Sequence, residues 1–264
     1  MSVKKSITEL AVIIPVYNES SCIEKVANEW RSAFVFKKIK FKIIFINDGS
    51  TDNTAEILER VSKEYPEIVL ISQVNGGHGN AVLNGYEEAL RLNADYVFQV
   101  DSDDQFLPSD FGQLWNERES SPFVLGFREK RNDPRMRLII TKTLKYFLRL
   151  ICKTSIRDAN IPYRLIESNF LRSALKNIPA DAFAPNIFLA VLSSRYLFSY
   201  PEIPVTHVER QTGEVSIVRM GLLKACLRSF IQLVTFSLQL DKKVSAMQSE
   251  LESTEIPETK KNYA

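Results

Sequence analysis

The sequence predicts an α/β fold in which a mostly parallel sheet is flanked by helices, with amphipathic helices toward the C-terminus. Short apolar runs rich in β-branched residues alternate with helical patterns of about 10 to 15 residues, which is typical of parallel sheets built from βαβ units. The 264 residues are 45% hydrophobic and 25% charged. A chain of this length and composition can form a full core without disulfides or metals.

Four strands are expected in the first half of the chain, each a short buried run that ends in a turn. They lie at residues 10–16, 41–46, 68–73 and 95–100, and helices are expected at about 20–34, at 53–64 and from about residue 80 onward. Asp52 is expected to cap the second helix. Because ligands bind at the carboxyl ends of parallel strands, the loops that leave these strands are the places to look for chemistry.

Charge, cysteine and histidine content argue against several classes of protein. A net charge of +2 does not favour nucleic acid as a partner. Three widely spaced cysteines favour a reducing compartment, and two histidines make a histidine-rich zinc site improbable. The longest uncharged apolar stretch, residues 229–240, is about half as long as a membrane-spanning helix. No spanning helix and no secretory signal are therefore expected.

Polar motifs follow all four expected strands. They are Pro15-Val16-Tyr17-Asn18-Glu19, Asn47-Asp48-Gly49-Ser50-Thr51-Asp52, Asn75-Gly76-Gly77-His78-Gly79-Asn80 and Asp101-Ser102-Asp103-Asp104-Gln105. The three carboxylates of the last motif repel one another unless a cation neutralises them. Oxygen ligands of this kind suit Mg²⁺ or Mn²⁺ together with a diphosphate. Each motif alone is weak evidence, because an isolated Asp-x-Asp is more often a solvated turn that caps a helix.

Together, in this order and at this spacing, the four motifs resemble those of the family-2 glycosyltransferases, which have the Rossmann-like GT-A fold. The resemblance is strong over residues 8–115 and continues more loosely to about residue 235. It implies that Asp48 contacts the nucleotide base and that Pro15, Tyr17 and Glu19 line the nucleotide pocket. It also implies that Asp101 and Asp103 act in catalysis by serving the ribose and the metal, with Gln105 as a further metal ligand.

Within that family, the sequence is similar to the dolichol-phosphate and polyprenyl-phosphate sugar synthases. The Asp101-x-Asp103-x-Gln105 spacing carries this similarity, together with two later motifs at residues 158–164 and 202–213. The Gln/Arg-x-x-Arg-Trp motif of processive polysaccharide synthases is absent. The chain departs from the branch in having His78 for lysine, Pro162-Tyr163 for Gly-Phe, and Gly213-Glu-Val-Ser216-Ile217 for Gly-x-Ser-Lys.

A basic segment follows the fourth motif. Residues 124–157 contain ten Lys and Arg against two acidic residues. The resemblance implies that Arg128, Arg137, Thr141 and Arg210 hold the phosphate of the acceptor. Two helical patterns are amphipathic. One has an apolar stripe of Ile140, Leu144, Phe147, Leu148 and Ile151 opposite Lys142, Lys145, Arg149 and Lys153; the other, over 217–240, gathers Met220, Leu223, Leu227, Phe230, Ile231, Val234 and Leu238. Either could lie on an anionic membrane or pack on the protein's own core.

The sequence is thus interpreted as an inverting, metal-dependent glycosyltransferase that moves a sugar from a UDP- or GDP-linked donor to a polyprenyl phosphate. The expected organisation is a catalytic domain over 1–212, with a nucleotide-sugar half over about 8–115 and an acceptor half over about 116–212. This domain is followed by an amphipathic segment at 213–240 and by a polar tail at 241–264. The tail is expected to fray. The expected location is the inner face of the membrane, on its cytoplasmic side and peripherally attached.

Three alternatives stay open. A sugar-hydroxyl acceptor would need a general base, for which Asp104, Asp158 and Asp181 are the candidates. A nicotinamide-dependent oxidoreductase could use the Gly77-x-Gly79 turn, although the third glycine of that fingerprint is replaced by Val82. A non-catalytic membrane-docking or partner-binding module that keeps the fold would show no metal-dependent nucleotide binding.

Overall fold

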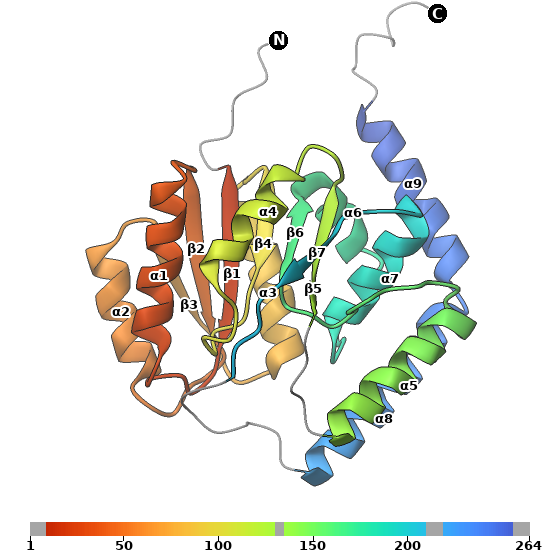
Figure 1. Ribbon diagram of the computed structural model, residues 1–264, viewed down its shortest axis with the longest axis horizontal. Coiled ribbons are helices and arrows are strands. Elements are labelled where there is room, and N and C mark those ends of the chain that lie inside the picture. The colour runs from red at the N-terminus through yellow and green to blue at the C-terminus, as the bar shows by residue number, and fades with distance from the viewer. Residues whose placement is uncertain (1–8, 130–134, 210–218, 256–264) are drawn as a thin grey trace, which may run out of the picture.

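The computed structural model describes residues 9–129, 135–209 and 219–255. Its centre is a seven-stranded sheet in the order β3-β2-β1-β4-β6-β5-β7, with helices on both faces (Figure 1). The strands are β1 (Leu10–Val16), β2 (Phe41–Asn47), β3 (Ile68–Ser72), β4 (Tyr96–Gln99), β5 (Phe123–Arg128), β6 (Arg164–Glu167) and β7 (Glu202–Val205). The helices are α1 (Ile23–Phe36), α2 (Thr54–Glu64), α3 (His78–Arg91), α4 (Phe111–Asn116), α5 (Arg135–Ile151), α6 (Ser168–Leu175), α7 (Pro185–Leu197), α8 (Arg219–Ser237) and α9 (Leu240–Glu255), and a 3-10 turn, η1, spans Pro108–Asp110.

The parallel half of the sheet consists of β1 to β4. β1 lies between β2 and β4 and is parallel to both, and β3 is parallel to β2. All seven residues of β1 are buried, which explains its uninterrupted apolar sequence. The predicted runs are confirmed, because each boundary of the four strands agrees with them to within one residue. Their carboxyl ends lie at one edge, so the four polar motifs are brought together there.

The other half of the sheet is mixed. β6 is antiparallel to both β4 and β5, and β5 is parallel to β7. The register places Arg164 opposite Gln99 of β4 and Leu125 of β5. The sheet is therefore mostly parallel, as predicted. β6 lies between β4, whose end carries the fourth polar motif, and β5.

The helices α5 and α8 lie side by side and extend beyond the sheet on the side where β1, β2 and β4 end (Figure 1). The rings of Phe147 and Phe230 are 4.8 Å apart at their centres. Leu148 is buried, and Leu144 and Phe147 pack against the core. Through these three residues the apolar stripe of α5 faces the protein itself, which was one of the two expectations for it, whereas Ile151 at the end of the stripe is exposed.

The predicted apolar face of α8 is more open. Phe230, Ile231 and Leu238 are exposed, whereas Leu233 and Phe236 supply the contacts with the core. None of the described helices is long and apolar enough to span a membrane.

The expectation that the chain frays from Asp241 onward is wrong for the described residues. Residues 240–255 form α9, which packs on α6 and α7. Leu240 and Met247 are buried, and Val244 and Leu251 pack against the core. These four positions follow a spacing of three and four residues, so a polar sequence with one narrow apolar stripe suffices for a docked helix.

Candidate active site

The loops after β1 and β2 are fastened to each other by side-chain hydrogen bonds. The backbone N–H of Asn18 donates to Ser50 Oγ at 3.0 Å, and that of Glu19 donates to Thr54 Oγ1 at 2.9 Å. Asn18 has a φ of 55° and its Oδ1 accepts the N–H of Thr51 at 2.8 Å. Several polar residues of the first two motifs therefore hold the loops in shape, which leaves neighbouring residues to face a ligand.

Asp52 links the same loops through its carboxylate. Its Oδ1 accepts the N–H of Thr54 at 3.0 Å and its Oδ2 that of Ser20 at 3.1 Å. Burial opposes the charged form, but the hydrogen bonds from Thr54 and Ser20 hold the pKa of Asp52 below its usual value. Asp52 thus binds the first turn of α2 as predicted, although Asn53 is the residue at the N-cap position.

Asp48 follows β2 and is only 3% exposed. Its Oδ1 accepts hydrogen bonds from Gln73 Nε2 and the N–H of Gly76, both at 2.8 Å, and its Oδ2 accepts the N–H of Gly77 at 2.9 Å. The predicted base-contacting residue is therefore also the anchor of the turn before α3. Gln73 is fixed in turn by Asn84, whose Nδ2 donates to its Oε1 at 2.6 Å.

The other residues predicted to line the nucleotide pocket lie close to this anchor. Pro15 is buried within β1, opposite Ile46 of β2. Tyr17 is the first residue after β1 and is 36% exposed, whereas Glu19 is buried. Glu19 also raises the pKa of Asp101, so the first and fourth motifs face each other.

The Gly77-His78-Gly79 turn is explained by packing within the protein. Gly77 has a φ of +84°, which favours glycine, and a Cβ at Gly79 would lie 2.3 Å from the carbonyl oxygen of Ala182 and 2.6 Å from that of Phe183. Gly79 is therefore needed where the loop before α7 crosses α3. A close approach of a dinucleotide is not required to account for it.

The loop after β4 separates its three carboxylates. Asp104 has a φ of 59° and its Oδ2 lies 2.6 Å from Lys25 Nζ of α1. Asp103 Oδ1 accepts the N–H of Gln105 at 3.3 Å. Among the described residues no three acidic, histidine or cysteine side chains converge as a metal site. The lysine thus neutralises one of the three charges, and Asp101 and Asp103 carry the others.

Asp101 has the most perturbed carboxyl group of the site. Its Oδ1 is buried without a hydrogen-bond partner and lies 4.0 Å from His78 Nε2. Burial raises the pKa of Asp101 to about 7, and the nearby guanidinium groups of Arg128 and Arg164 oppose that rise. A buried carboxylate oxygen without a partner is a fitting ligand for a cation.

Gln105 joins this loop to the segment after β7. Its backbone carbonyl accepts the N–H of Val208 at 2.9 Å, and its side-chain Nε2 donates to the carbonyl of Val208 at 2.9 Å. Phe106 packs on His207 with ring centres 5.1 Å apart. With Nε2 used in this way, Oε1 is the Gln105 atom that suits a cation. Two carboxylates and an amide oxygen are a donor set that fits Mg²⁺ or Mn²⁺ bound together with phosphates.

Of the four residues predicted to bind the acceptor, the structure places Arg128 close to Asp101. Arg128 ends β5 and binds Asp158 in two places, at 2.8 Å between Nε and Oδ2 and at 3.0 Å between Nη2 and Oδ1. Thr141 is partly buried in α5. The side chain of Arg137 and all of Arg210 lie outside the described residues.

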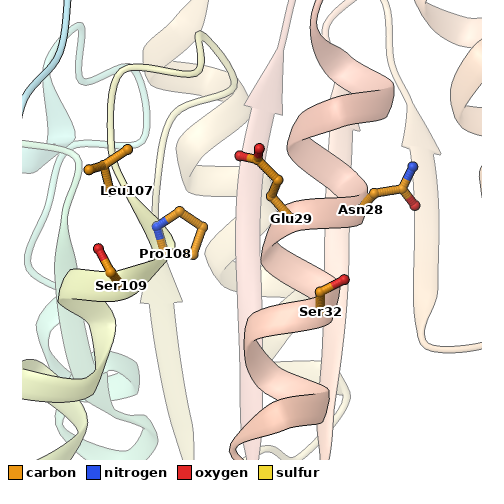
Figure 2. A pocket seen from close by; sticks show the side chains of 6 residues that line it. All are labelled: Asn28, Glu29, Ser32, Leu107, Pro108 and Ser109. Carbon is orange, nitrogen blue, oxygen red and sulfur yellow. The ribbon is translucent and has the colours of Figure 1, made fainter.

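The shallow cleft shown in Figure 2 lies elsewhere, between the outer side of α1 and the loop at Leu107–Ser109. It is lined by Asn28, Glu29, Ser32, Leu107, Pro108 and Ser109. These residues include a single carboxylate and no cation, so the cleft lacks the groups needed to hold a diphosphate. The site at the strand ends is therefore identified by its carboxylate, amide and guanidinium groups and not by a deep pocket.

Sequence reasoning missed three residues of this site. Gln73 anchors Asp48, Lys25 pairs with Asp104, and Arg164 is completely buried beside the Asp158 turn. Arg164 belongs to the motif at residues 158–164 that the sequence analysis had identified. An arginine at the start of a buried strand is unusual, and this signal could have pointed to it. Gln73 and Lys25 carry no comparable signal, because each meets its partner through the fold.

Comparisons with known proteins agree with this geometry. The model of glycosyl transferase family 2 matches residues 11–172, which is more than half of the chain. Two curated relatives are both undecaprenyl-phosphate 4-deoxy-4-formamido-L-arabinose transferases. The one from Edwardsiella ictaluri is 26% identical over 85% of this chain and 66% of its own length, and the one from Yersinia enterocolitica is 25% identical over 91% and 72%. The chain thus spans about two thirds of the length of these relatives.

Solved structures show the same fold. Glucosyl-3-phosphoglycerate synthase from Mycobacterium tuberculosis, in complex with Mn²⁺, UDP-glucose and phosphoglyceric acid, superposes with a TM-score of 0.63 at 17% identity, over 87% of this chain and 80% of that one. The same enzyme with phosphoglyceric acid alone gives a TM-score of 0.64 at 18% identity over the same shares. Strand-end motifs, sheet order and family match lead to one conclusion: the chain belongs to glycosyl transferase family 2 and has the GT-A fold.

Proposed function

We propose that this glycosyltransferase moves a sugar, with inversion at the anomeric carbon, from a nucleoside diphosphate sugar to a polyprenyl phosphate at a membrane surface. The observation that carries the proposal is the meeting of two sites of opposite charge. Asp101 and Asp103 suit a metal-bound diphosphate, and Arg128, which acts electrostatically on Asp101, suits a second anion beside it. The curated relatives are named for transfer to undecaprenyl phosphate.

The donor nucleotide is proposed to be UDP. A carboxylate accepts about four hydrogen bonds, and Asp48 already accepts three within the protein. One further donor suits uracil, which has a single N–H on its pairing edge, whereas guanine presents two neighbouring donors there. Tyr17, Pro15 and Glu19 would form the rest of the nucleotide pocket. The structurally similar glucosyl-3-phosphoglycerate synthase binds UDP-glucose.

Asp101, Asp103 and Gln105 would hold Mg²⁺ or Mn²⁺. Such an ion neutralises the negative charge that develops on the departing diphosphate. The solved relative contains Mn²⁺ together with UDP-glucose. The protein's own part is to present the carboxylates of Asp101 and Asp103 from the loop after β4, with the third charge neutralised by the Lys25–Asp104 pair.

A phosphate acceptor explains how the reaction proceeds without an evident general base. Its oxygen is already ionised near neutral pH and can attack the anomeric carbon directly. The three acids considered as bases for a hydroxyl acceptor are all engaged: Asp104 pairs with Lys25, Asp158 with Arg128, and Asp181 with Arg228. Guanidinium groups match the oxygens of phosphate, so Arg128, with Arg137, Thr141 and Arg210, is proposed to bind the acceptor headgroup.

The paired helices α5 and α8 are proposed to contact the lipid surface on the cytoplasmic side. Phe230 and Ile231 of α8 and Leu238, which directly follows this helix, are exposed, as are Tyr146 and Leu150 of α5. Aromatic and aliphatic side chains interspersed with basic ones favour the interface of an anionic membrane. Cys22 and Cys152 are buried thiols outside any disulfide, which agrees with a reducing compartment.

The test is transfer of radiolabel into a lipid product. Purified protein, undecaprenyl phosphate and Mn²⁺ or Mg²⁺ are incubated in turn with labelled UDP-glucose, UDP-N-acetylglucosamine, GDP-mannose and a UDP-linked 4-deoxy-4-formamido-L-arabinose. The proposal predicts label in the organic phase with a UDP-linked donor, and none after EDTA. Metal-dependent binding of a UDP-sugar without any lipid product would move the acceptor to a sugar hydroxyl and refute the proposal.

A further inference from the structure

Arg164, the first residue of β6, is a completely buried cation whose guanidinium binds neutral main-chain oxygens. Nη1 donates to the carbonyl of Asn186 at 2.8 Å and Nε to that of Ile161 at 3.1 Å. Nη2 donates to the carbonyls of Ala159 and Ile161. A buried charge is tolerated when it is hydrogen-bonded in this way. The side chain thus fastens the turn at residues 159–161 to β6 and to the start of α7.

This turn directly follows Asp158, which is 4% exposed. Both carboxylate oxygens of Asp158 bind Arg128, through its Nε at 2.8 Å and its Nη2 at 3.0 Å. A bidentate pair of this kind fixes the plane of the guanidinium as well as its position. The Arg128 side chain is itself only 14% exposed, so its orientation depends on the place of Asp158.

The arrangement lies beside the predicted metal loop. Arg164 is opposite Gln99 in the sheet, and Gln99 is two residues before Asp101. Arg128 and Arg164 both act on the carboxyl group of Asp101 through their charge. The guanidinium of Arg128 is therefore close to the place where donor and acceptor would meet.

We infer that Arg164, the 159–161 turn and Asp158 form a positioning unit that holds the Arg128 guanidinium in the orientation that binds the phosphate of the lipid acceptor. The inference rests on the proposed function, because it assumes an anionic acceptor. It makes Asp158 a positioning residue and not a general base, because each of its oxygens holds one nitrogen of the Arg128 guanidinium.

Asp158→Asn is the primary test. The amide keeps the size of the side chain but loses the charge and one acceptor oxygen. The KM for undecaprenyl phosphate is expected to rise about tenfold or more, as for loss of a hydrogen bond to a charged group. The kcat at saturating acceptor and the KM for the nucleotide sugar are expected to stay unchanged. If Asp158 were a general base, kcat would collapse at unchanged acceptor KM and the pH profile would lose its acidic limb, which would overturn the inference.

Glu24→Gln is the matched control. Glu24 of α1 forms a bidentate pair with Arg60 of α2, at 2.9 and 2.7 Å, but on the exposed surface. The substitution makes the same chemical change as Asp158→Asn, but in an exposed pair that joins α1 to α2. It is expected to leave both KM values and kcat unchanged, so a matching rise in the acceptor KM of this variant would also count against the inference.

Arg164→Lys tests the far end of the unit. Lysine keeps the charge but cannot reach three carbonyls in one plane. In a variant that retains the wild-type circular dichroism spectrum, the acceptor KM is expected to rise as in Asp158→Asn. Because the two residues act on one guanidinium, the double variant is expected to show less than the product of the two changes. Fully multiplicative effects would contradict a single unit, and if Arg164→Lys does not fold, Asp158→Asn alone decides.

Failure of the inference can be told apart from failure of the proposed function. A wild-type protein that transfers no label to undecaprenyl phosphate from any donor refutes the proposed function, and the inference with it. A wild-type protein that makes the lipid product, together with an Asp158→Asn variant of unchanged acceptor KM, refutes the inference alone.

Discussion

Substitution of Asp48 by Asn is the sharpest test of the nucleotide side of the site. The carboxylate accepts three hydrogen bonds, from Gln73 and from the N–H groups of Gly76 and Gly77, and is 3% exposed. An amide retains one acceptor oxygen and presents N–H groups where the other stood. With the oxygen kept in the Oδ1 position, the N–H of Gly77 faces another donor and water has little room to replace the lost partner.

The expected loss of stability follows from these contacts. The bond to Gly77 disappears, which costs about 1 kcal/mol, and the other two lose the charge of their acceptor, which costs about 1 kcal/mol each. The sum of about 3 kcal/mol corresponds to a fall in Tm of about 6 to 12 °C for a chain of this size. Asp241→Asn is the control, because Asp241 is 85% exposed and pairs with Arg195 at the surface, where an ion pair contributes about 1 kcal/mol or less.

The assay is thermal unfolding at neutral pH in the absence of nucleotide, followed by calorimetric titration with UDP. Asp48→Asn is expected to melt earlier than both the wild type and Asp241→Asn, and to bind UDP more weakly. A variant that melts together with the wild type would refute the conclusion that Asp48 anchors the turn before α3. Equal UDP affinity in the two proteins would remove Asp48 from the nucleotide pocket.

Three further outcomes are expected. Gly79→Ala should lower Tm by about 2 to 12 °C, because overpacking against a rigid backbone costs about 1 to 3 kcal/mol and its Cβ would lie 2.3 Å from a carbonyl oxygen. Gly112→Ala, whose Cβ meets only the end of a lysine side chain, is the control, and equal melting of the two would contradict the packing. Asp52→Asn should lower Tm at pH 7 by an amount that shrinks as the solution is made acidic: the pKa of Asp52 is lowered in the folded protein, so its contribution is fully present above the unfolded pKa of about 3.9 and is lost as the pH falls from there through the folded pKa. A difference in Tm that stays constant across this pH range would refute that assignment. Ile231→Ser combined with Leu238→Ser should reduce sedimentation with anionic phospholipid vesicles while leaving Tm within a few degrees, since both side chains are exposed; undiminished binding would remove this surface from the lipid contact.

The nucleotide half of the site could be predicted from the sequence for a simple physical reason. In a parallel sheet, the residues that follow each strand lie at one edge regardless of the length of the connecting helices. Four buried runs followed by polar motifs were therefore enough to place Tyr17, Asp48 and Asp101 near one another. The family resemblance then supplied roles that position alone does not give.

Residues whose partners come from distant parts of the chain could not be predicted in the same way. Lys25 meets Asp104 across 79 positions and Gln73 meets Asp48 across 25. Neither pairing follows from periodicity or from strand ends, because each depends on how a helix or loop folds back over the edge. The same holds for Asp158, which the sequence analysis considered as a base and which the structure pairs with Arg128.

Amphipathic patterns showed which residues share a face but not what covers that face. The stripe of α5 packs inward through Leu148, whereas on α8 the predicted apolar face exposes Ile231. The helix α9 was missed because its sequence is polar apart from one narrow stripe that includes Met247. A count of apolar positions at helical spacing would have found α9, because the spacing of that stripe is regular.

The central claim is metal-dependent transfer to a polyprenyl phosphate by the carboxylates after β4. Its most direct test compares the wild type with Asp103→Asn, using labelled UDP-sugar, undecaprenyl phosphate and Mn²⁺, after both proteins are shown to melt at the same temperature. The account predicts lipid-linked label with the wild type, its loss on addition of EDTA, and almost none with Asp103→Asn. Transfer by Asp103→Asn at the wild-type rate, or wild-type transfer that survives EDTA, would contradict it.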